Sequence, residues 1–504
     1  MKRDLGGLTA REHDLVVIGG GIHGAAAAYD AAQRGLLVAL VEASDFGSGV
    51  SWNSLKTIHG GLRHLQRADL AQARESVRER RALLRIAPQI VRPLQFLVPT
   101  YGHGLHGREA LAAGLRLHDL VSHDRNEGLP PEQQLPASRV LSRGEVQQIV
   151  PEVGAQGLTG GALWFDAQVT HSERLVMGFC HAAAEAGATL ANYVAAIGFL
   201  RSGRDVTGIR ARDVEGGGEL AVRSRMVLIA TGPGLDRLLT RAEVTATGSP
   251  MLLGMNLVLR RPVVTGHAVG ARSGGRYLFL VPWRGRAILG TAYDPPNVAP
   301  DVAVARFLDD AHRAFPWAAI EAGDVTLVHR GLVPGRRGSR ALETRSRLID
   351  HEAAEGVRGL VSLRGVKLTT ARAEAAKAVD LVLRRLSRPA APCGTAVTPL
   401  AAARPLEGSV ATQTLRAVRE EMAIHLADVV LRRTNLGTAG PPADRDLDAA
   451  ASAMASALGW NDGKARAERQ AVQVRDPAKT GPEGTDDEPT AARTDRAVWV
   501  KGPP

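Results

Sequence analysis

The sequence predicts an α/β protein in which a helix-covered parallel sheet is joined to a second, antiparallel or mixed sheet and to a C-terminal helical unit. The parallel part follows from the apolar run 15–18, which ends in glycines and precedes an alanine-rich stretch, as a buried strand precedes a helix. Alternation of apolar and polar residues over 251–292 indicates an antiparallel sheet. Helical patterns at 412–433 and 446–459 indicate the C-terminal unit.

The glycines after the first strand follow the pattern Gly19-x-Gly21-x-x-Gly24. In such a turn Gly19 permits the sharp bend, Gly21 lets a pyrophosphate approach the backbone, and Gly24 lets the helix pack on the strand. The N-terminus of the expected helix, 25–34, offers free N–H groups and a partial positive charge to phosphates. The sequence therefore predicts a Rossmann-like dinucleotide site.

An acidic residue completes this motif. The second expected strand, 36–41, is followed by Glu42, about 20 residues beyond the glycines, where a carboxylate binds the ribose hydroxyls. A complete strand–helix–strand unit with its acid is far more specific than glycines alone. Its position a few residues from the N-terminus favours FAD over NAD.

Length and composition exclude several classes of protein. The 504 residues allow more than one domain, and no run of 18 apolar residues or secretory signal occurs. The two cysteines, Cys180 and Cys393, form neither a disulfide framework nor a metal motif, so we expect a cytoplasmic protein without a metal site. The net charge is +11, but the basic residues are scattered and aromatics make up 4%. This excludes nucleic acid and leaves peripheral contact with an anionic membrane open.

Further elements follow from composition along the chain. The region 93–160 is expected to be loop-rich. The other expected elements are a glycine- and serine-rich loop at 44–65, helices at 68–86 and 173–186, a strand–turn–strand at 195–212, a strand ending in a glycine turn at 225–234, and a strand, glycine turn and helix at 360–385.

Several longer motifs occur in a fixed order. They are Ile18-Gly-Gly-Gly-Ile-His-Gly-Ala25, Glu42-Ala-Ser-Asp45, Ser54-Leu-Lys-Thr-Ile-His-Gly-Gly-Leu-Arg-His-Leu65, Ala230-Thr-Gly-Pro233, Val281-Pro-Trp283, Gly290-Thr-Ala-Tyr-Asp294, Gly365-Val-Lys-Leu-Thr-Thr-Ala-Arg372 and Ala423-Ile-His-Leu-Ala-Asp-Val-Val-Leu-Arg-Arg-Thr434. In this order they resemble the FAD-dependent, quinone-linked glycerol-3-phosphate dehydrogenases over residues 12–460.

The resemblance implies an oxidoreductase of glycerol metabolism that oxidises a small anionic alcohol by hydride transfer to flavin and passes electrons to quinone or another acceptor. It also implies how the chain is divided. We expect an FAD-binding domain at 12–92, 160–235 and 340–388, a substrate domain at 93–159 and 236–339, a helical domain at 400–470, and a disordered tail at 476–504.

The same resemblance assigns site residues. We expect His59 to accept the hydroxyl proton, Lys367 to stabilise reduced flavin, and Arg345 to position the substrate. The expected substrate-binding residues are Arg63, His64, Asn256, Arg336 and Arg345. The expected cofactor-binding residues are Gly19, Gly21, Gly24, Glu42, Ser54, Lys56, His59, Gly60, Val194, Thr231, Gly232, Lys367, Leu368 and Thr369.

The chain also departs from the family. Val333 stands where a phosphate-binding arginine is common, Asn256 where a histidine is common, and His64 where a tyrosine is common. Arg336 and Arg337 are candidates to replace the missing charge. A buried phosphate without a charged partner is costly, so the substrate need not be glycerol 3-phosphate.

Each motif also fits an ordinary structural role, such as a solvated Lys56, a simple Gly-Pro turn after Thr231 or a helix cap before Lys367. Trp164, Asp166 and Trp283 are expected in the core or sheet. Two alternative functions therefore stay open: a flavin oxidase or dehydrogenase of another hydroxy or amino acid, and a flavin-binding protein without catalysis. The oligomeric state is not predicted.

Overall fold

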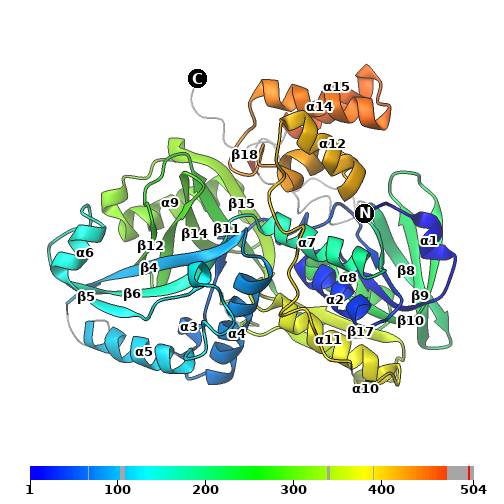
Figure 1. Cartoon of the computed structure of the whole chain (residues 1–504), viewed down its shortest axis with the longest axis horizontal. Helices are drawn as coiled ribbons and strands as arrows, with labels where there is room; N and C mark the ends of the chain where they lie inside the picture. The colour runs from blue at the N-terminus through cyan, green and yellow to red at the C-terminus, as the bar shows by residue number, and fades with distance from the viewer. Residues whose placement is uncertain (66, 103–107, 338–340, 390, 474–497, 500–504) are drawn as a thin grey trace.

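The computed structural model describes residues 1–65, 67–102, 108–337, 341–389, 391–473 and 498–499. Within them the chain forms two large sheets side by side, with C-terminal helices lying across one end of the molecule (Figure 1). This arrangement confirms the predicted fold class.

The first sheet has eight strands, of which the five from β17 to β7 run parallel. Its order is β16 (Arg347–Asp350), β17 (Leu360–Arg364), β10 (Glu219–Ile229), β1 (His13–Ile18), β2 (Val38–Val41) and β7 (Thr189–Ala191), with β8 (Val194–Ser202) and β9 (Asp205–Asp213) forming an antiparallel ribbon on β10. The central strand β1 is almost entirely buried because helices and the ribbon cover both faces, which explains its unbroken apolar run.

Three helices pack together against this sheet. They are α2 (Ile22–Gln33), α7 (Ser172–Glu185) and α11 (Ala371–Arg385), and α2 contacts both of the others. The alanines at 25–28 of α2 are buried, and their small side chains let the neighbouring helices approach closely. Helix α2 begins three residues before the expected start because Gly21 is its N-cap.

The second sheet has ten strands, and every pair except β12–β4 is antiparallel. Its order is β18 (Val498–Trp499), β15 (Val325–Pro334), β11 (Met251–Leu259), β14 (Arg286–Asp294), β13 (Arg276–Trp283), β12 (His267–Ser273), β4 (Val91–Tyr101), β6 (Leu158–Val169) and β3 (Thr57–Ile58), with β5 (Arg139–Ser142) beside β6. The alternation over 251–292 is therefore confirmed as strands.

The expectation of a loop-rich region at 93–160 is wrong. It holds most of β4 and the helices α5 (Arg108–Val121) and α6 (Arg143–Ile149). Pro93 and Pro99 interrupt the strand pattern in the sequence, yet both lie outside the segment 95–97 that pairs with β12, so no ladder bond to β12 is lost there.

The remaining helices lie around the two sheets. They are α1 (Leu5–Thr9), α3 (Leu62–Leu65), α4 (Leu70–Ile86), α8 (Leu235–Arg241), α9 (Pro300–Ala314) and α10 (His351–Glu355). Residues 57–58 and 160–169 belong to the second sheet, whereas the sequence assigned them to the FAD-binding domain.

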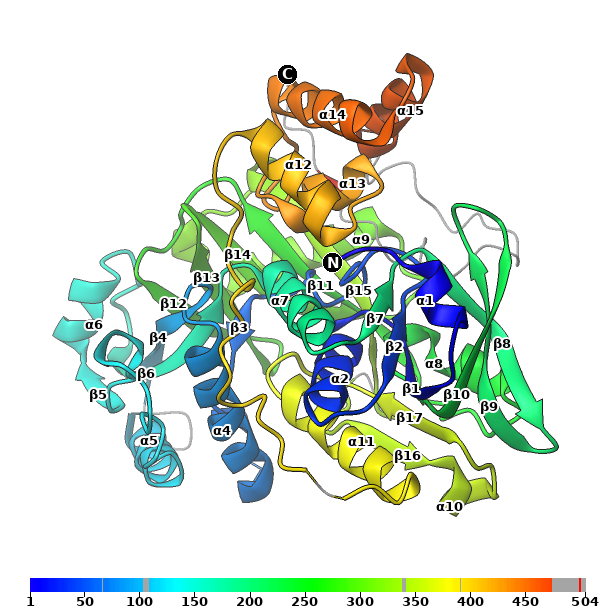
Figure 2. The same ribbon diagram turned by 45° about the vertical axis from the view of Figure 1, so that its right-hand side comes forward.

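The C-terminal helices form a group above α7 (Figure 2). They are α12 (Val410–Glu421), α13 (Leu426–Asp428), the π-helical turn η5 (Val429–Arg433), α14 (Asp444–Leu458) and α15 (Asp462–Gln473). The expectation of one helix over 412–433 is wrong, because Met422 adopts a left-handed φ of 55° and ends α12. Helix α15 was not expected, since its mostly charged and polar sequence carries a weak apolar pattern.

Most of the expected tail lies outside the described residues. Two of its residues, Val498–Trp499, pair with Leu327 and Val328 of β15. This pairing differs from the disorder that is expected for the tail. Among the helices of the described residues, none combines the length and apolar content that crossing a bilayer requires.

Candidate active site

A cavity of about 930 Å³ opens where the ends of β1 and β2 meet β11 and β15 of the second sheet. Its wall includes glycines of the N-terminal motif on one side and side chains of both second-sheet strands on the other. The volume matches that of sites for large organic ligands. We call the part near the glycines the cofactor end and the part near Lys367 the substrate end.

The cofactor end depends on close backbone packing. Gly19 has a φ of 108°, which favours glycine, and a Cβ there would lie 2.7 Å from the carbonyl oxygen of Ala230. A Cβ on Gly24 would lie 1.8 Å from the carbonyl oxygen of Gly19, so α2 meets β1 only with glycine at this position. A Cβ on Gly21 would lie 3.2 Å from the Ser51 hydroxyl. The packing at Gly19 and Gly24 agrees with the sharp turn and the close helix contact that their spacing predicts, and Gly21 lines the cavity.

Glu42 and the start of α2 supply the polar groups of this end. The Glu42 carboxylate accepts hydrogen bonds from the backbone N–H groups of Gly20, at 2.6 Å, and Ser44, at 2.9 Å. The N-cap residue of α2, Gly21, has no side chain that could cap the helix, and Ile22 N–H donates to Ser51 Oγ at 3.0 Å. A carboxylate for ribose and a helix N-terminus for phosphates therefore lie in one cavity, and these residues fit a dinucleotide such as FAD.

Many of the expected site residues line the cavity. Those that do are Gly19, Gly21, Glu42, Ser54, Thr231, Gly232, Asn256, Lys367 and Leu368. The others, which lie outside its lining, are Gly24, Lys56, His59, Gly60, Arg63, His64, Val194, Arg336, Arg345 and Thr369. Val194 is buried, and its backbone N–H donates to the Glu42 carbonyl at 2.8 Å, so it holds the backbone of Glu42.

Lys56 is buried rather than solvated. Its ammonium group donates to the Trp52 carbonyl at 2.7 Å, to Ser172 Oγ at 2.9 Å and to Glu173 Oε2 at 2.8 Å. Burial lowers the pKa of Lys56, while the Glu173 carboxylate opposes that shift. The side chain therefore anchors the loop that carries Ser54, and its charge is neutralised inside the protein.

His59 lies between two parts of the site. Its Nδ1 is 3.6 Å from Asp166 Oδ2, its Nε2 is 2.8 Å from Thr57 Oγ1, and its backbone N–H donates to Thr369 Oγ1 at 3.3 Å. The side chain is 52% exposed. Burial raises the pKa of Asp166, but the Arg80 guanidinium and His59 outweigh burial and lower that pKa to about 2.

Gly60 and Gly61 next to His59 have a packing role that the sequence did not indicate. A Cβ on Gly60 would lie 2.0 Å from the Arg80 guanidinium, and a Cβ on Gly61 would lie 2.8 Å from the Cα of Ala73 in α4. Gly60 N–H also donates to Asp166 at 2.6 Å. The glycine pair therefore lets the loop lie against α4.

The substrate end carries a positive cluster. Lys367 Nζ lies 2.6 Å from Nε2 of His64, so the ammonium donates and the imidazole accepts. Burial lowers the pKa of Lys367 to about 8, with a further contribution from the Arg63 charge. Burial and the Lys367 charge lower the pKa of His64 to about 4. His64 is therefore neutral near pH 7 and holds Lys367 in place.

A polar chain lies on the opposite wall. Thr291 Oγ1 donates to Asn256 Oδ1 at 2.7 Å, and burial raises the pKa of Tyr293, while a hydrogen bond with Thr291 acts against that shift. All three residues line the cavity, as does Val333. Two of the three predicted departures from the family, Asn256 and Val333, thus lie on the cavity wall.

The candidate replacement arginines lie elsewhere. Arg337 donates to the Gly248 carbonyl at 3.2 Å, and both Arg336 and Arg337 are exposed and outside the cavity lining. Arg345 pairs with Asp69 at 2.8 Å and is 64% exposed. None of these three guanidinium groups takes the place that Val333 leaves.

Three functional candidates were missed in the sequence. Ser51 supports the start of α2, Asp166 organises the His59 loop, and Thr291 joins Asn256 to Tyr293. The only available signal was a polar residue within an otherwise apolar or glycine-rich motif, because Ile22, Gly60 and Asn256, which bond to these residues, lie 29, 106 and 35 residues away along the chain.

A family model described as FAD dependent oxidoreductase matches residues 14–379. The chain belongs to this family. Glycerol-3-phosphate dehydrogenase of Synechocystis sp. is 34% identical over 413 residues, 77% of this chain and 73% of that protein. Mitochondrial glycerol-3-phosphate dehydrogenase of Bos taurus is 32% identical over 76% of this chain and 54% of that protein. The aligned part thus spans roughly half to three quarters of these relatives.

Solved structures show the same fold. The glycerol-3-phosphate dehydrogenase of Bacillus halodurans complexed with FAD matches with a TM-score of 0.70 and 21% identity over 93% of this chain and 95% of that one. Glycine oxidase of Geobacillus kaustophilus matches with a TM-score of 0.52 and 22% identity over 77% and 98%. The predicted resemblance and the FAD cofactor are confirmed, and the chain is an FAD-dependent oxidoreductase by family.

Proposed function

We propose that this protein is a dehydrogenase that oxidises a small anionic alcohol of the glycerol 3-phosphate type and passes the electrons to a quinone or another acceptor. The observation that carries the proposal is Lys367, a half-buried cation on the cavity wall held 2.6 Å from His64. Arg63 adds positive charge, since it lowers the pKa of Lys367, His64 and Tyr293. An anionic substrate matches this cluster.

In this proposal each residue of the substrate end has a separate role. When bound, FAD supplies the acceptor for the hydride that leaves the alcohol carbon. Lys367 stabilises negative charge that develops in the cavity, and Arg63 attracts the anionic group. Arg345 and Arg336 lie on the surface around the site and add to its positive field.

We assign acceptance of the hydroxyl proton to His59. The ionised Asp166 lies 3.6 Å from Nδ1, an arrangement that orients an imidazole and stabilises its charged form after it accepts a proton. The backbone N–H of His59 donates to Thr369 Oγ1, two residues from Lys367, so the loop of the base is joined to the segment of the cation.

Anaerobic reduction of the bound flavin tests this function. Purified protein is mixed without oxygen with glycerol 3-phosphate, glycerol, a 2-hydroxy acid or an amino acid, and the visible flavin absorbance is followed. We expect bleaching by glycerol 3-phosphate and none by glycerol, whereas bleaching by the 2-hydroxy acid alone would favour a different substrate class. Bleaching by an amino acid alone would contradict the proposal.

A second function is favoured by the cavity wall itself. Val333 and Asn256 remove a positive charge and an imidazole from the positions where the family commonly has them, which suits a carboxylate with one negative charge better than a phosphate with two. A hydroxy or amino acid oxidase or dehydrogenase is therefore the alternative. Oxygen consumption without an added quinone would support an oxidase. Flavin that no member of the panel bleaches would instead support a binding protein without catalysis.

A quinone acceptor requires contact with a membrane, and a surface beside the site is a candidate for that contact. Leu70 of α4 is 52% exposed, and Leu117 and Leu120 of α5 are 42% and 71% exposed. These helices are adjacent, since Arg74 donates to the Val121 carbonyl at 2.6 Å. Exposed Arg67 and Arg116 accompany the leucines. We propose that this surface, the α4–α5 face, contacts an anionic membrane, from which a quinone would be reached.

Vesicle sedimentation tests this contact. Wild type should sediment with vesicles that contain anionic phospholipid at low salt, and Leu117→Gln/Leu120→Gln should reduce the bound fraction about tenfold. The control is Leu458→Gln, which removes another exposed leucine, 38% exposed, from α14. Equal binding of the double variant and wild type would contradict membrane contact at this face.

A further inference from the structure

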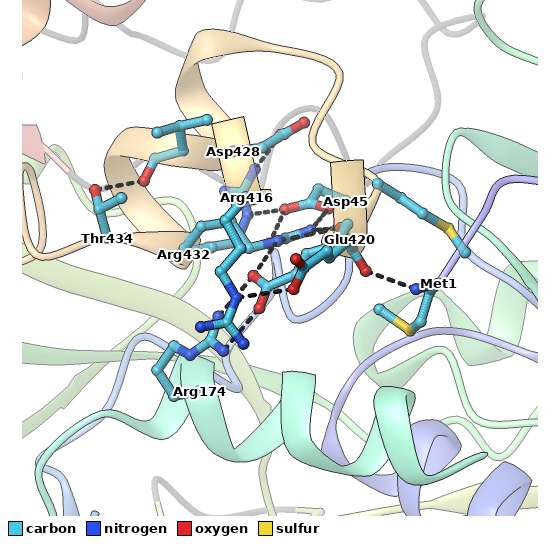
Figure 3. A network of polar contacts seen from close by, with 12 residues as sticks. Met1, Asp45, Arg174, Arg416, Glu420, Asp428, Arg432 and Thr434 are labelled. Atoms are coloured by element: carbon cyan, nitrogen blue, oxygen red, sulfur yellow. Dashed lines mark hydrogen bonds and ion pairs between the residues drawn. The ribbon is translucent and has the colours of Figure 1, made fainter. Parts of the chain in front are cut away.

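A buried ion cluster joins the C-terminal helices to the cofactor end of the cavity (Figure 3). Asp45, three residues after Glu42, has no exposed surface. Arg432 Nε donates to its Oδ2 at 2.6 Å, and Arg433 binds both of its oxygens, at 2.8 and 2.6 Å. Both arginines lie on the π-helical turn η5, a form that is uncommon and often found at functional sites.

The cluster also fixes the segment that supports Glu42. Asn192 donates to Asp45 at 3.2 Å, and Tyr193 donates its hydroxyl to Asp428 at 2.6 Å. Arg432 binds that same Asp428 oxygen at 2.8 Å. The backbone N–H of Tyr193 in turn donates to the Ser44 carbonyl at 2.9 Å. The arginines therefore hold two chain segments, 42–45 and 192–194, against each other.

The cluster extends away from the cavity to a second carboxylate. Glu421 pairs with both terminal nitrogens of Arg174 in α7, at 2.7 and 2.8 Å, and Arg433 donates to the Glu421 backbone carbonyl at 3.1 Å. Burial raises the pKa of Asp45, but the charges of Arg433 and Arg432 outweigh burial and hold that pKa below its usual range. Every charge of the cluster thus has a buried partner.

Packing alone does not explain why ions occupy this place. A buried ion cluster loses much of its hydration energy, and apolar side chains of similar volume often stabilise a protein equally well. Apolar contacts are non-directional, whereas the paired bonds from Arg433 fix the orientation of one carboxylate. That carboxylate belongs to the loop whose other residues, including Glu42, Ala43 and Ser48, line the cavity.

We propose that Arg432 and Arg433 are positioning residues of the FAD site, which hold the ribose-binding Glu42 in place through Asp45. The C-terminal helices are thereby part of the cofactor site although none of their residues lines the described cavity. The inference does not depend on which substrate is oxidised.

The test compares two arginines of the same cluster. Arg433→Lys keeps the charge but loses the bond to both oxygens of Asp45. Arg174→Lys makes the same change at a side chain that is 3% exposed and contacts Glu421 instead. For each full-length variant, FAD is removed and titrated back while flavin fluorescence is recorded, and the melting temperature of the flavin-free protein is measured.

A positioning role predicts that Arg433→Lys weakens FAD binding about tenfold or more, whereas Arg174→Lys changes the dissociation constant less than about twofold at a similar loss of melting temperature. Arg432→Lys should resemble Arg433→Lys. If Arg433→Lys does not fold, Arg432→Lys and Asp45→Asn provide the same comparison. Equal FAD affinities in the Arg433 and Arg174 variants, or losses that simply follow melting temperature, would overturn the proposal.

Discussion

The two ends of the cavity hold their functional groups by different means. At the cofactor end, glycines set the backbone of β1 and α2, and the N–H groups and Glu42 follow from that backbone. Near the substrate end, Lys367 comes from one chain segment and His59 and His64 from another, and side-chain contacts hold them. A backbone site tolerates few substitutions and keeps its spacing, whereas a side-chain site changes its chemistry by single replacements. Asn256 and Val333 are predicted to be such replacements.

The largest effect should follow a change at the backbone end. Gly21→Val would place branched carbons beyond a Cβ that already lies 3.2 Å from Ser51 Oγ, in the space through which a pyrophosphate reaches the helix. We expect colourless protein without bound FAD, measured by visible absorbance. Gly144→Val in α6, where a Cβ meets nothing within 4 Å, is the control and should stay yellow. A yellow, active Gly21→Val protein would remove the basis of the cofactor assignment.

Loss of the proposed base should leave FAD in place and slow turnover. His59→Gln changes a side chain that is 52% exposed, so the fold should persist, and kcat should fall about 10²- to 10⁴-fold because general base catalysis is lost. Turnover and flavin content are measured on the same sample. A kcat within about threefold of wild type would show that the proton is taken elsewhere, with Lys367 the next candidate.

Restoring the missing charge should sharpen the contrast between the ends. Val333 lines the cavity, so Val333→Arg would place a guanidinium where a substrate phosphate is expected. Charge-assisted hydrogen bonds contribute about 1.5–3 kcal/mol, which corresponds to about ten- to hundredfold tighter binding of glycerol 3-phosphate. Titration of flavin absorbance with substrate measures the change, and Val333→Met is the control for size. If wild type already binds glycerol 3-phosphate tightly and the double variant Arg336→Ala/Arg337→Ala abolishes that binding, those arginines bind the phosphate.

The same difference between the two ends of the cavity explains which parts of the site could be predicted from the sequence. The glycine spacing and Glu42 are local in the chain, so their geometry was predictable, and the alternation over 251–292 gave the second sheet. His59, by comparison, depends on Asp166, which is more than 100 residues away, and Asp45 depends on Arg433, 388 residues away. Such pairs leave no periodic pattern. Lys56 was expected in the site for its rarity, yet its partner Glu173 lies inside the protein.

The break at Met422 and the strands within 93–160 were missed for related reasons. A left-handed φ at a methionine has no composition signal, and the turn that follows it is held by Asp428, which accepts the N–H groups of Ile424 and His425 at 2.9 Å. In β4, prolines suggested loops, but pairing with β6 along most of its length outweighs local preference.

Titration of Lys367 should give a pH dependence of intermediate size. Its pKa is lowered to about 8, so the side chain is charged below that pH and mostly neutral above it. If the charge stabilises negative character in the cavity, kcat should fall as pH rises through about 8, by about tenfold at pH 9. Lys367→Arg, which stays charged, should remove this decline. A rate that rises through the same range would instead identify neutral Lys367 as the proton acceptor.

The smallest effect concerns the rim of the substrate end, where Arg345 pairs with Asp69 at 2.8 Å and both groups meet solvent. To reach an anionic substrate Arg345 must leave this pair, and exposed pairs contribute little to stability. Arg345→Gln should therefore raise KM about fivefold for an anionic substrate and leave the melting temperature unchanged. Asp69→Asn should lower KM, because it frees Arg345 while an asparagine still accepts the helix-capping bond from Gln72 N–H. Both effects should fade at high salt, as expected for exposed charges. If the two variants change KM in the same direction, the pair is a structural element of α4, and Arg345 has no part in substrate binding.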